Sequence, residues 1–541
     1  MRRIVSACAL LGAISVGWWL RAQLAVNIPP MASDMPAGAL LYLEAKDFAK
    51  LLGEWNNSQE KVKWVGSTNY DVLSRSRLIG RLQQAQGELE QAAGVSAEMK
   101  LLQQVAGTRS AFAFYNLGAL KFVYITHLDH GSIEASDLWK QRSQYQPRAA
   151  GGQAFYVKQD QQSGRTVAFA SKDDVFAIAT DESLMATTLE LLAGQSAPAL
   201  AKDEWFQSIT VGKRQGDLRL VYDLRDVQRT PQFRTYWIQQ NQTELKEYAA
   251  GISDLFETSQ GFEEERVLVR AAGTSAPSAS GAIEMLVGAV TPGDSLYRAW
   301  ANPAKGQLTD ALEQVVYGET PPANPFMDQM APAAPAGFVQ PAYAPGLETR
   351  IDQRPVVKAA RKPVDTLVET VAAMQPTALL HVQSTAALRD NVFVVPGSAL
   401  MIACERADAA AFGRALRGML GAAMESGGLD PLTVRVEGNV LVLSRGEGTV
   451  SNVNTRAAAT TETYAAGYNH AAEWPKYTRL FRLIDGRTGG APGMASSQGR
   501  PAFFAGDVQS LGDALIRLQR ASLKRTDAGR QISEIVLYEM K

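Results

Sequence analysis

Hydrophobic and polar residues recur with two different periods along this chain. In RLIGRLQQAQGELEQAA the apolar positions Leu78, Leu82, Ala85, Leu89 and Ala92 follow one another at intervals of 4, 3, 4 and 3 residues. This is the spacing of one helix face, so the stretch predicts an amphipathic helix. It lies in a helical region that we expect to follow the short strand ALLYLEA and to reach about residue 107.

Short apolar or alternating runs predict strands beyond that region. They read SAFAFYN, ALKFVYITHL, QAFYVKQ, TVAFAS and VFAIAT, with a helix expected from about Ser132 to Gln144 between the second and the third. The sequence DESLMATTLELLAG then predicts a helix that ends at a glycine. DLRLVYDLRDVQ and ERVLVRAAG each add a strand, with a helical stretch between them.

The opening of this series recurs later in the chain. PAGALLYLEAKDFAKLL begins at Pro36, and PGDSLYRAWANPAKGQLTDALEQVV begins at Pro292. The second copy is followed by the strands TALLHVQ and ALMIACE, the helix DAAAFGRALRGMLGAAM and the hairpin LTVRVEGNVLVLSRG, which turns at Gly438-Asn439. TVAFASKDDVFAIAT occupies the same place in the first series.

The two series also end alike. Asp226 and Asp507 each begin an Asp-Val-Gln triplet after a strand, and the last strands are Glu265 to Arg270 and Glu534 to Glu539. We therefore predict an α+β fold of two tandem related halves after an N-terminal hydrophobic helix. Each half is expected to be a mainly antiparallel sheet with helices packed on one face.

The predicted domain boundaries follow from this repetition and from composition. An N-terminal segment occupies 1–25, the first half 30–275, a linker 276–284 and the second half 285–541. A strip rich in Pro and Ala at 321–345 interrupts the second half. Such a strip acts either as a semi-rigid spacer over its own domain or as a segment that docks in a groove.

The N-terminus carries the strongest single signal. Arg2 and Arg3 precede seventeen apolar or small residues, 4–20, which include Trp18 and Trp19. Basic residues on one side and aromatic residues on the other are typical of a retained membrane anchor, and a cleaved signal peptide is the alternative. Either interpretation places the bulk of the chain outside the cytoplasm, tethered to the inner membrane or released into the periplasm.

Overall composition narrows the possible partners. The chain of 541 residues carries 54 Lys and Arg against 55 Asp and Glu, so no net field draws it to nucleic acid. Cys8 lies in the apolar N-terminal segment and Cys404 stands alone, so the folded region has no disulfide pair of its own. Phosphate-binding loops, nucleophile elbows and the common zinc-binding motifs are absent from the sequence.

One cluster could in principle bind a metal. THLDHGSIE contains His127, Asp129, His130 and Glu134, a spacing at which imidazole and carboxylate groups can be zinc ligands. The repeat argues against that interpretation, because Asp129 aligns with Asp408 while the two histidines align with Arg and Ala. A helix N-cap explains the aspartate in both halves. His127 and His130 are therefore disfavoured as metal ligands, and we predict no catalytic residue and no cofactor.

The other polar candidates have plain structural explanations. His381 and His470 stand far apart in the sequence, as expected of ordinary hydrogen-bonded side chains. The acidic run FEEER, 262–266, precedes a strand, and the arginines of SRSRLIGR fall on the polar face of a helix. Paired carboxylates can do acid–base work and arginines can bind lipid headgroups, but a solvated surface accounts for both.

The opening motifs and the N-terminal segment resemble a group of uncharacterised bacterial envelope proteins. These have a membrane-proximal N-terminus and a large extracytoplasmic region that opens on a strand like that of PAGALLYLEAKDFAKLL and DSLYRAWANP. The resemblance implies a location in the bacterial envelope and supplies no catalytic residues.

We expect a membrane-tethered, non-enzymatic binding or scaffolding protein, with an envelope protein or a lipid as partner. A carrier that holds an apolar or lipid ligand between the two halves is the first alternative. An envelope hydrolase with a carboxylate-based site is the second.

Overall fold

The structure is a computed structural model. It describes residues 30–75, 77–231, 246–274, 281–290, 296–317, 364–388, 393–420, 432–445, 461–476 and 512–541. The predicted N-terminal segment, the Pro/Ala-rich strip and Asp507 lie outside these residues. Within them, no helix combines the length and the apolar character needed to cross a bilayer.

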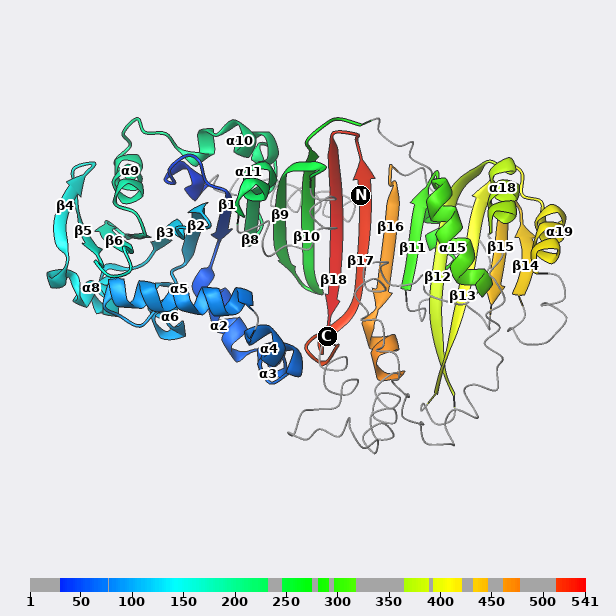
Figure 1. Ribbon diagram of the computed structural model, residues 1–541, viewed down its shortest axis with the longest axis horizontal. Helices are drawn as coiled ribbons and strands as arrows, with labels where there is room; N and C mark the ends of the chain where they lie inside the picture. The colour runs from blue at the N-terminus through cyan, green and yellow to red at the C-terminus, as the bar shows by residue number, and fades with distance from the viewer. Residues whose placement is uncertain are drawn as a thin grey trace, which may run out of the picture.

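In the described part of the chain, a single sheet of eighteen strands runs across the molecule (Figure 1). Every pairing between its described strands is antiparallel. The first half contributes, in spatial order, β4 (Gln146–Ala150), β5 (Gln153–Gln159), β6 (Thr166–Lys172), β7 (Val175–Ala179), β3 (Lys121–His127), β2 (Arg109–Asn116), β1 (Leu41–Ala45), β8 (Leu218–Asp223), β9 (Tyr248–Thr258) and β10 (Gly261–Arg270).

The second half continues the same sheet from the edge of β10. Its order is β18 (Gln531–Met540), β17 (Leu518–Asp527), β16 (Tyr464–Asn469), β11 (Leu296–Ala301), β12 (Pro376–Leu388), β13 (Phe393–Cys404), β15 (Val440–Arg445) and β14 (Leu432–Glu437). The two strands predicted to end the halves, β10 and β18, are therefore the pair that joins them.

The pairings run in the same order in both halves. The first strand of each series, β1 or β11, lies between the second strand and a later one, β8 or β16. A hairpin, β6–β7 or β14–β15, then adds to the third strand. The turn at Gly438 has a positive φ of 58°, and its counterpart Asp173 has a φ of 54°, as tight hairpin turns require.

Helices cover both faces of the first half, so the prediction of helices on one face is wrong. One face carries α2 (Phe48–Asn57), α5 (Arg77–Ala93), α6 (Met99–Val105), α7 (His130–Ala135) and α8 (Asp137–Lys140), and the other carries the 3-10 helices η1 (Met31–Ser33) and η3 (Leu200–Lys202) with α9 (Glu182–Leu192) and α10 (Glu204–Thr210). Helices α3 (Gln59–Val65) and α4 (Thr68–Ser74) follow α2 and project beyond the sheet (Figure 1). The physical reason is that β6 is apolar on both sides: Phe169 enters one core, and Ala168 and Ala170 enter the other.

The second half is built similarly. One core lies under α15 (Lys305–Tyr317), α18 (Asp365–Ala373) and α19 (Ala409–Leu420), and the other under α14 (Ala282–Val287). Helix α14 begins within the segment predicted as a linker, 276–284. The short helix α11 (Leu224–Arg229) follows β8 in the first half.

The single helix predicted from Ser132 to Gln144 is broken. Ser136 is extended, with ψ 143°, and its hydroxyl accepts a hydrogen bond from the backbone of Trp139 to begin α8. A 3-10 turn, η2 (Arg142–Gln144), leads into β4, a strand that the sequence analysis did not predict. Four of the five β4 residues are exposed, so this edge strand lacks the alternation by which a half-buried strand is identified.

Candidate functional site: an apolar pocket under helices α5 and α6

A pocket of about 460 Å³ lies between the helices α5 and α6 and the sheet. Its floor is formed by side chains of β2, β3, β6 and β7, chiefly Phe112, Phe122, Tyr124, Val167 and Ile178. These residues alternate along their strands with residues of the opposite core, which places them all on the face covered by α5 and α6. The rings of Phe112 and Phe122 pack with their centroids 5.2 Å apart. The floor is therefore a continuous aromatic and aliphatic surface.

The turn between α5 and α6 forms the roof. Gly94 ends α5 with a φ of 71° and donates to the carbonyl of Glu90, a backbone conformation that favours glycine. The Glu90 carboxylate accepts the backbone N–H of Ala97 at 3.0 Å, and the Gln86 amide donates to the Ala97 carbonyl at 3.2 Å. These polar side chains fix the turn, so its small apolar residues face the pocket.

The pocket wall has four polar residues, of which Gln86, Tyr124 and Thr180 form hydrogen bonds within the protein and Glu98 is exposed to solvent. The Tyr124 hydroxyl donates to the Val105 carbonyl at 2.8 Å, and burial raises the pKa of this phenol. The Thr180 hydroxyl donates to the Leu120 carbonyl and accepts the N–H of Phe122. Since the buried hydroxyl groups already have partners, the enclosed part of the wall favours hydrocarbon over a hydrogen-bonding ligand.

The size and lining of the pocket are those of a small-molecule site. Ligand pockets usually measure roughly 300–1,000 Å³ and are lined mainly by apolar side chains. On α6, Leu101 and Val105 line this pocket together with Met99 and Leu102, which are also exposed to solvent. An apolar molecule would thus meet apolar side chains both at the entrance and inside.

The sequence-predicted cluster does not converge. Asp129 caps α7 by accepting the N–H of Ser132 at 2.9 Å, as predicted. It also accepts the Ser132 hydroxyl, and this bond together with the backbone bond lowers the pKa of the Asp129 carboxyl group. His127 instead pairs with Asp174, at 2.9 Å between Nδ1 and Oδ2, and this contact lowers the aspartate pKa. His130 lies 3.5 Å from Glu134 on the exposed surface of α7.

The aligned aspartate of the second half has the same role. Asp408 accepts the N–H of Ala411 at 2.9 Å, so the capping prediction is confirmed in both halves. His381 contacts the Ser398 hydroxyl at 2.9 Å, and His470 contacts the Gly512 carbonyl at 3.1 Å. Among the described residues, no group of three or more His, Cys, Asp or Glu side chains is arranged to hold a metal ion.

The carboxylates of the FEEER run are engaged in ion pairs. In the FEEER run, Glu263 and Glu265 both accept from Arg214, and Glu264 accepts two N–H groups of Arg266 at 2.6 Å. Arg266, with hydrogen bonds from Ser253 and Tyr538, holds the pKa of Glu264 low against the effect of burial. A general acid needs a raised pKa, so this run is better explained as a structural network.

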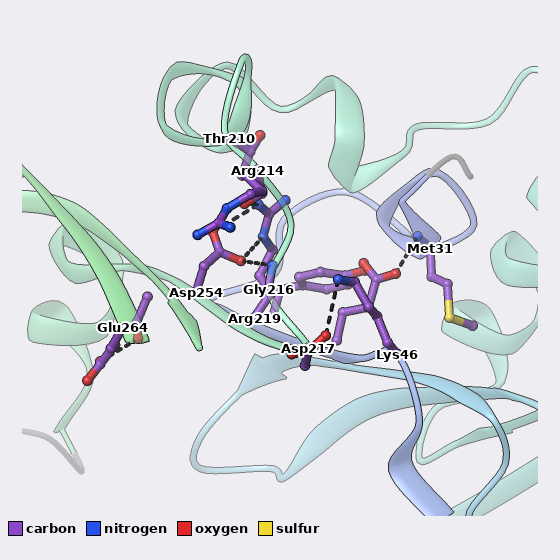
Figure 2. A network of polar contacts seen from close by, with 12 residues as sticks. Met31, Lys46, Thr210, Arg214, Gly216, Asp217, Arg219, Asp254 and Glu264 are labelled. Atoms are coloured by element: carbon purple, nitrogen blue, oxygen red, sulfur yellow. Dashed lines mark hydrogen bonds and ion pairs between the residues drawn. The ribbon is translucent and has the colours of Figure 1, made fainter. Parts of the chain in front are cut away.

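A second network of charged groups lies deeper in the sheet (Figure 2). Arg219 of β8 and Asp254 of β9 face each other in the ladder, are both nearly inaccessible to solvent, and form two hydrogen bonds of 2.7 and 2.9 Å. Asp254 also accepts the N–H of Gly216. Arg219 also donates to the Arg214 carbonyl, so both charged groups are engaged within the protein, which points to a structural role.

Comparison with known proteins adds little. No known protein family and no curated protein matches this chain. Among solved structures, crystal form III of TP0453 has a TM-score of 0.25 and 11% identity over 49% of this chain and 86% of that chain. Crystal form I of the same protein gives a TM-score of 0.24 and 12% identity, over 48% and 85% of the two chains. Likeness at this level carries no argument about fold or function.

Proposed function

We propose that this chain is a non-enzymatic binding protein of the bacterial envelope, and that the pocket under α5 and α6 takes the hydrocarbon part of a lipid ligand. The observation that carries the proposal is the pocket itself, whose wall is mainly apolar and whose buried hydroxyl groups, on Tyr124 and Thr180, have partners. A single acyl chain is the occupant that such a wall favours, because each buried methylene contributes about 0.8 kcal/mol.

This proposal differs in location from the carrier expected from the sequence. That carrier held its ligand between the two halves, whereas this pocket lies wholly within the first half. The halves meet instead through the β10–β18 pairing. The envelope location and the tether rest on the N-terminal sequence, with Arg2, Arg3, Trp18 and Trp19 as its basis.

We further propose that the two halves arose by duplication. The repeated order of strand pairings supports this, as do the two capping aspartates Asp129 and Asp408. Only the first half would have kept the site, since its helical region between the first two strands is the one that forms the pocket roof. Between β11 and β12 the described helices α15 and α18 pack directly on the core.

The test uses the uncharged fluorophore N-phenyl-1-naphthylamine and its displacement by palmitate. We expect saturable binding to the full chain in detergent-free buffer, and loss of most of it in Ala97→Trp, which fills the pocket from the roof. Ser96→Trp is the matched control, because Ser96 is exposed and does not line the pocket. Equal binding by both variants and the unaltered chain would overturn the proposal.

A further inference from the structure

Large apolar side chains are exposed along the helices that follow β1. Of the thirteen exposed large apolar residues in the described part of the chain, eight lie on α2 to α6. Val62 is 69% exposed, and Leu82 is 50% exposed although it belongs to the face predicted to pack inward. Isolated exposed apolar residues are ordinary, but a concentration in one region marks an interaction surface.

These side chains are arranged in pairs along successive helices. Val62 and Val65 are three residues apart on α3, and Tyr70 and Leu73 are three residues apart on α4, so each pair shares a helix face. The Trp64 and Tyr70 rings, 6.3 Å apart, join α3 to α4. Figure 1 shows α3 and α4 projecting beyond the sheet, at the end of α5 that lies away from β4. The projecting helices thus carry paired apolar side chains toward solvent.

The same segment is basic, although the whole chain is nearly neutral. From residue 59 to residue 82 there are five basic and two acidic residues, a local net charge of +3 against −1 for the protein. The basic residues are Lys61, Lys63, Arg75, Arg77 and Arg81.

Only one of the two acidic residues offsets a basic residue of this segment. The Glu60 side chain is 17% exposed and pairs with Arg517 of the second half. Asp71 of α4 pairs with Arg75, which follows the helix, and by count this leaves four basic residues of the segment without a charge partner inside it. What the segment presents outward is therefore apolar and basic.

We propose that α3, α4 and the first turns of α5 form a docking surface for an anionic lipid bilayer. Short amphipathic helices with Trp, Tyr and branched apolar side chains lie in the headgroup region with their apolar face ~5–10 Å deep, and basic residues strengthen binding to anionic lipid. Charge complementarity favours an anionic bilayer over a protein partner. Exposed valines and leucines alone are enough to bind a protein, whereas the excess of positive charge matches anionic headgroups.

The surface leads toward the pocket, which gives it a place in the proposed function. Helix α5 carries Leu82 at the docking surface and, further along, Leu89 and Ala93 in the pocket wall. The docking surface itself stands on exposure and charge, and does not depend on the pocket being occupied.

The test places an environment-sensitive probe on the surface of the full chain. Val62→Cys, made with Cys8→Ser, is labelled with the fluorophore NBD; Cys404 is buried and burial raises its pKa to about 11, so it stays unlabelled. Vesicles of phosphatidylcholine, with or without phosphatidylglycerol, are then added. A local probe is needed because the N-terminal segment can attach the chain to vesicles independently. Val211→Cys, 76% exposed on the α10 side, is the matched control.

We expect the emission at position 62 to shift to the blue on vesicles containing phosphatidylglycerol, with little change at position 211. Lys61→Gln with Lys63→Gln should lower the ratio of inserted to free probe roughly fivefold for each lysine removed. Val65→Cys repeats the measurement if the first labelled variant does not fold. An unchanged spectrum at both positions 62 and 65, or equal shifts on neutral and anionic vesicles, would overturn the proposal. Ala97→Trp should leave the shift intact, so this test and that of the pocket fail separately.

Discussion

Arg266 of β10 lies directly opposite Glu534 of β18, with Nη1 and Oε2 3.8 Å apart across the seam between the two halves. Glu534 also accepts two hydrogen bonds from Arg525 of β17, at 2.6 and 2.7 Å. Its side chain is 7% exposed, so these contacts are made with little solvent present. The halves are therefore joined by charge-assisted contacts in addition to the backbone ladder.

Removing the charge of Glu534 should weaken this seam. Glu534→Gln leaves two guanidinium groups without their shared carboxylate, and a hydrogen bond to a charged group contributes ~1.5–3 kcal/mol. We expect the free energy of unfolding to fall by about 2 kcal/mol in urea denaturation. Glu539→Gln, on the same strand but exposed, is the control and should stay within about 0.5 kcal/mol. Equal losses in the two variants would contradict this account.

The two capping aspartates, Asp129 and Asp408, should contribute similar amounts to the free energy of unfolding. Asp129→Ala and Asp408→Ala each leave an N–H group at the start of a helix without its acceptor, which typically costs about 1 kcal/mol. Asn substitutions at the same positions should keep most of that stability, because Asn caps nearly as well. Urea unfolding of the four variants measures this. If Asn were as damaging as Ala, the negative charge rather than the cap would be responsible.

Breaking the buried Arg219–Asp254 pair should be among the most damaging single changes in the sheet. Arg219→Met leaves the Asp254 carboxylate uncompensated at a site where the residue is only 3% exposed, and such losses reach ~3–5 kcal/mol. The double variant Arg219→Met with Asp254→Leu should recover a large part of the lost stability, because no buried charge then remains. Thermal unfolding compares the two. A double variant less stable than the single one would show that the pair itself is strongly stabilising.

Much of the fold could be predicted from local patterns. Periodicity and turn chemistry correctly located the helix Arg77–Ala93, the hairpin at Gly438 and the strands β10 and β18. The strands β16 and β17 were not predicted. In β17 the basic residues Arg520, Lys524 and Arg525 interrupt the apolar pattern. Those charges are accommodated by partners on other segments, such as Glu534 for Arg525, and a linear pattern does not show them.

The pocket could not be predicted from the sequence, because it depends on which part of helix α5 is in contact with the strands beneath it. Along α5 the apolar residues have even helical spacing, yet Ala85 and Ala92 are buried while Leu82 is half exposed. Whether a position on that stripe is core, pocket wall or exposed surface depends on the strands beneath it. The available signal was the pairing of bulky Phe112 and Phe122 on the strands with the small Ala93 of α5, which line the pocket together.

The pH dependence of stability should carry a signature of His381. This side chain is buried on β12 beside Arg298 of β11, its partner in the ladder, and burial together with that positive charge lowers its pKa from 6.5 to about 4. The unfolded chain therefore binds a proton at a pH where the folded chain does not. The stability contributed by neutral His381 is complete above pH ~6.5, falls as the pH drops, and is lost below about 4.

Over that window the loss should approach about 3 kcal/mol, at ~1.4 kcal/mol for each pH unit between the two pKa values. Urea unfolding at intervals between pH 4 and pH 7, for the unaltered chain and for His381→Gln, isolates this contribution from that of the acidic residues. The difference between the two free energies should be largest near neutrality and shrink toward pH 4. A constant difference would mean that His381 has the same pKa in the folded and the unfolded chain. It would contradict the lowering of this pKa by burial.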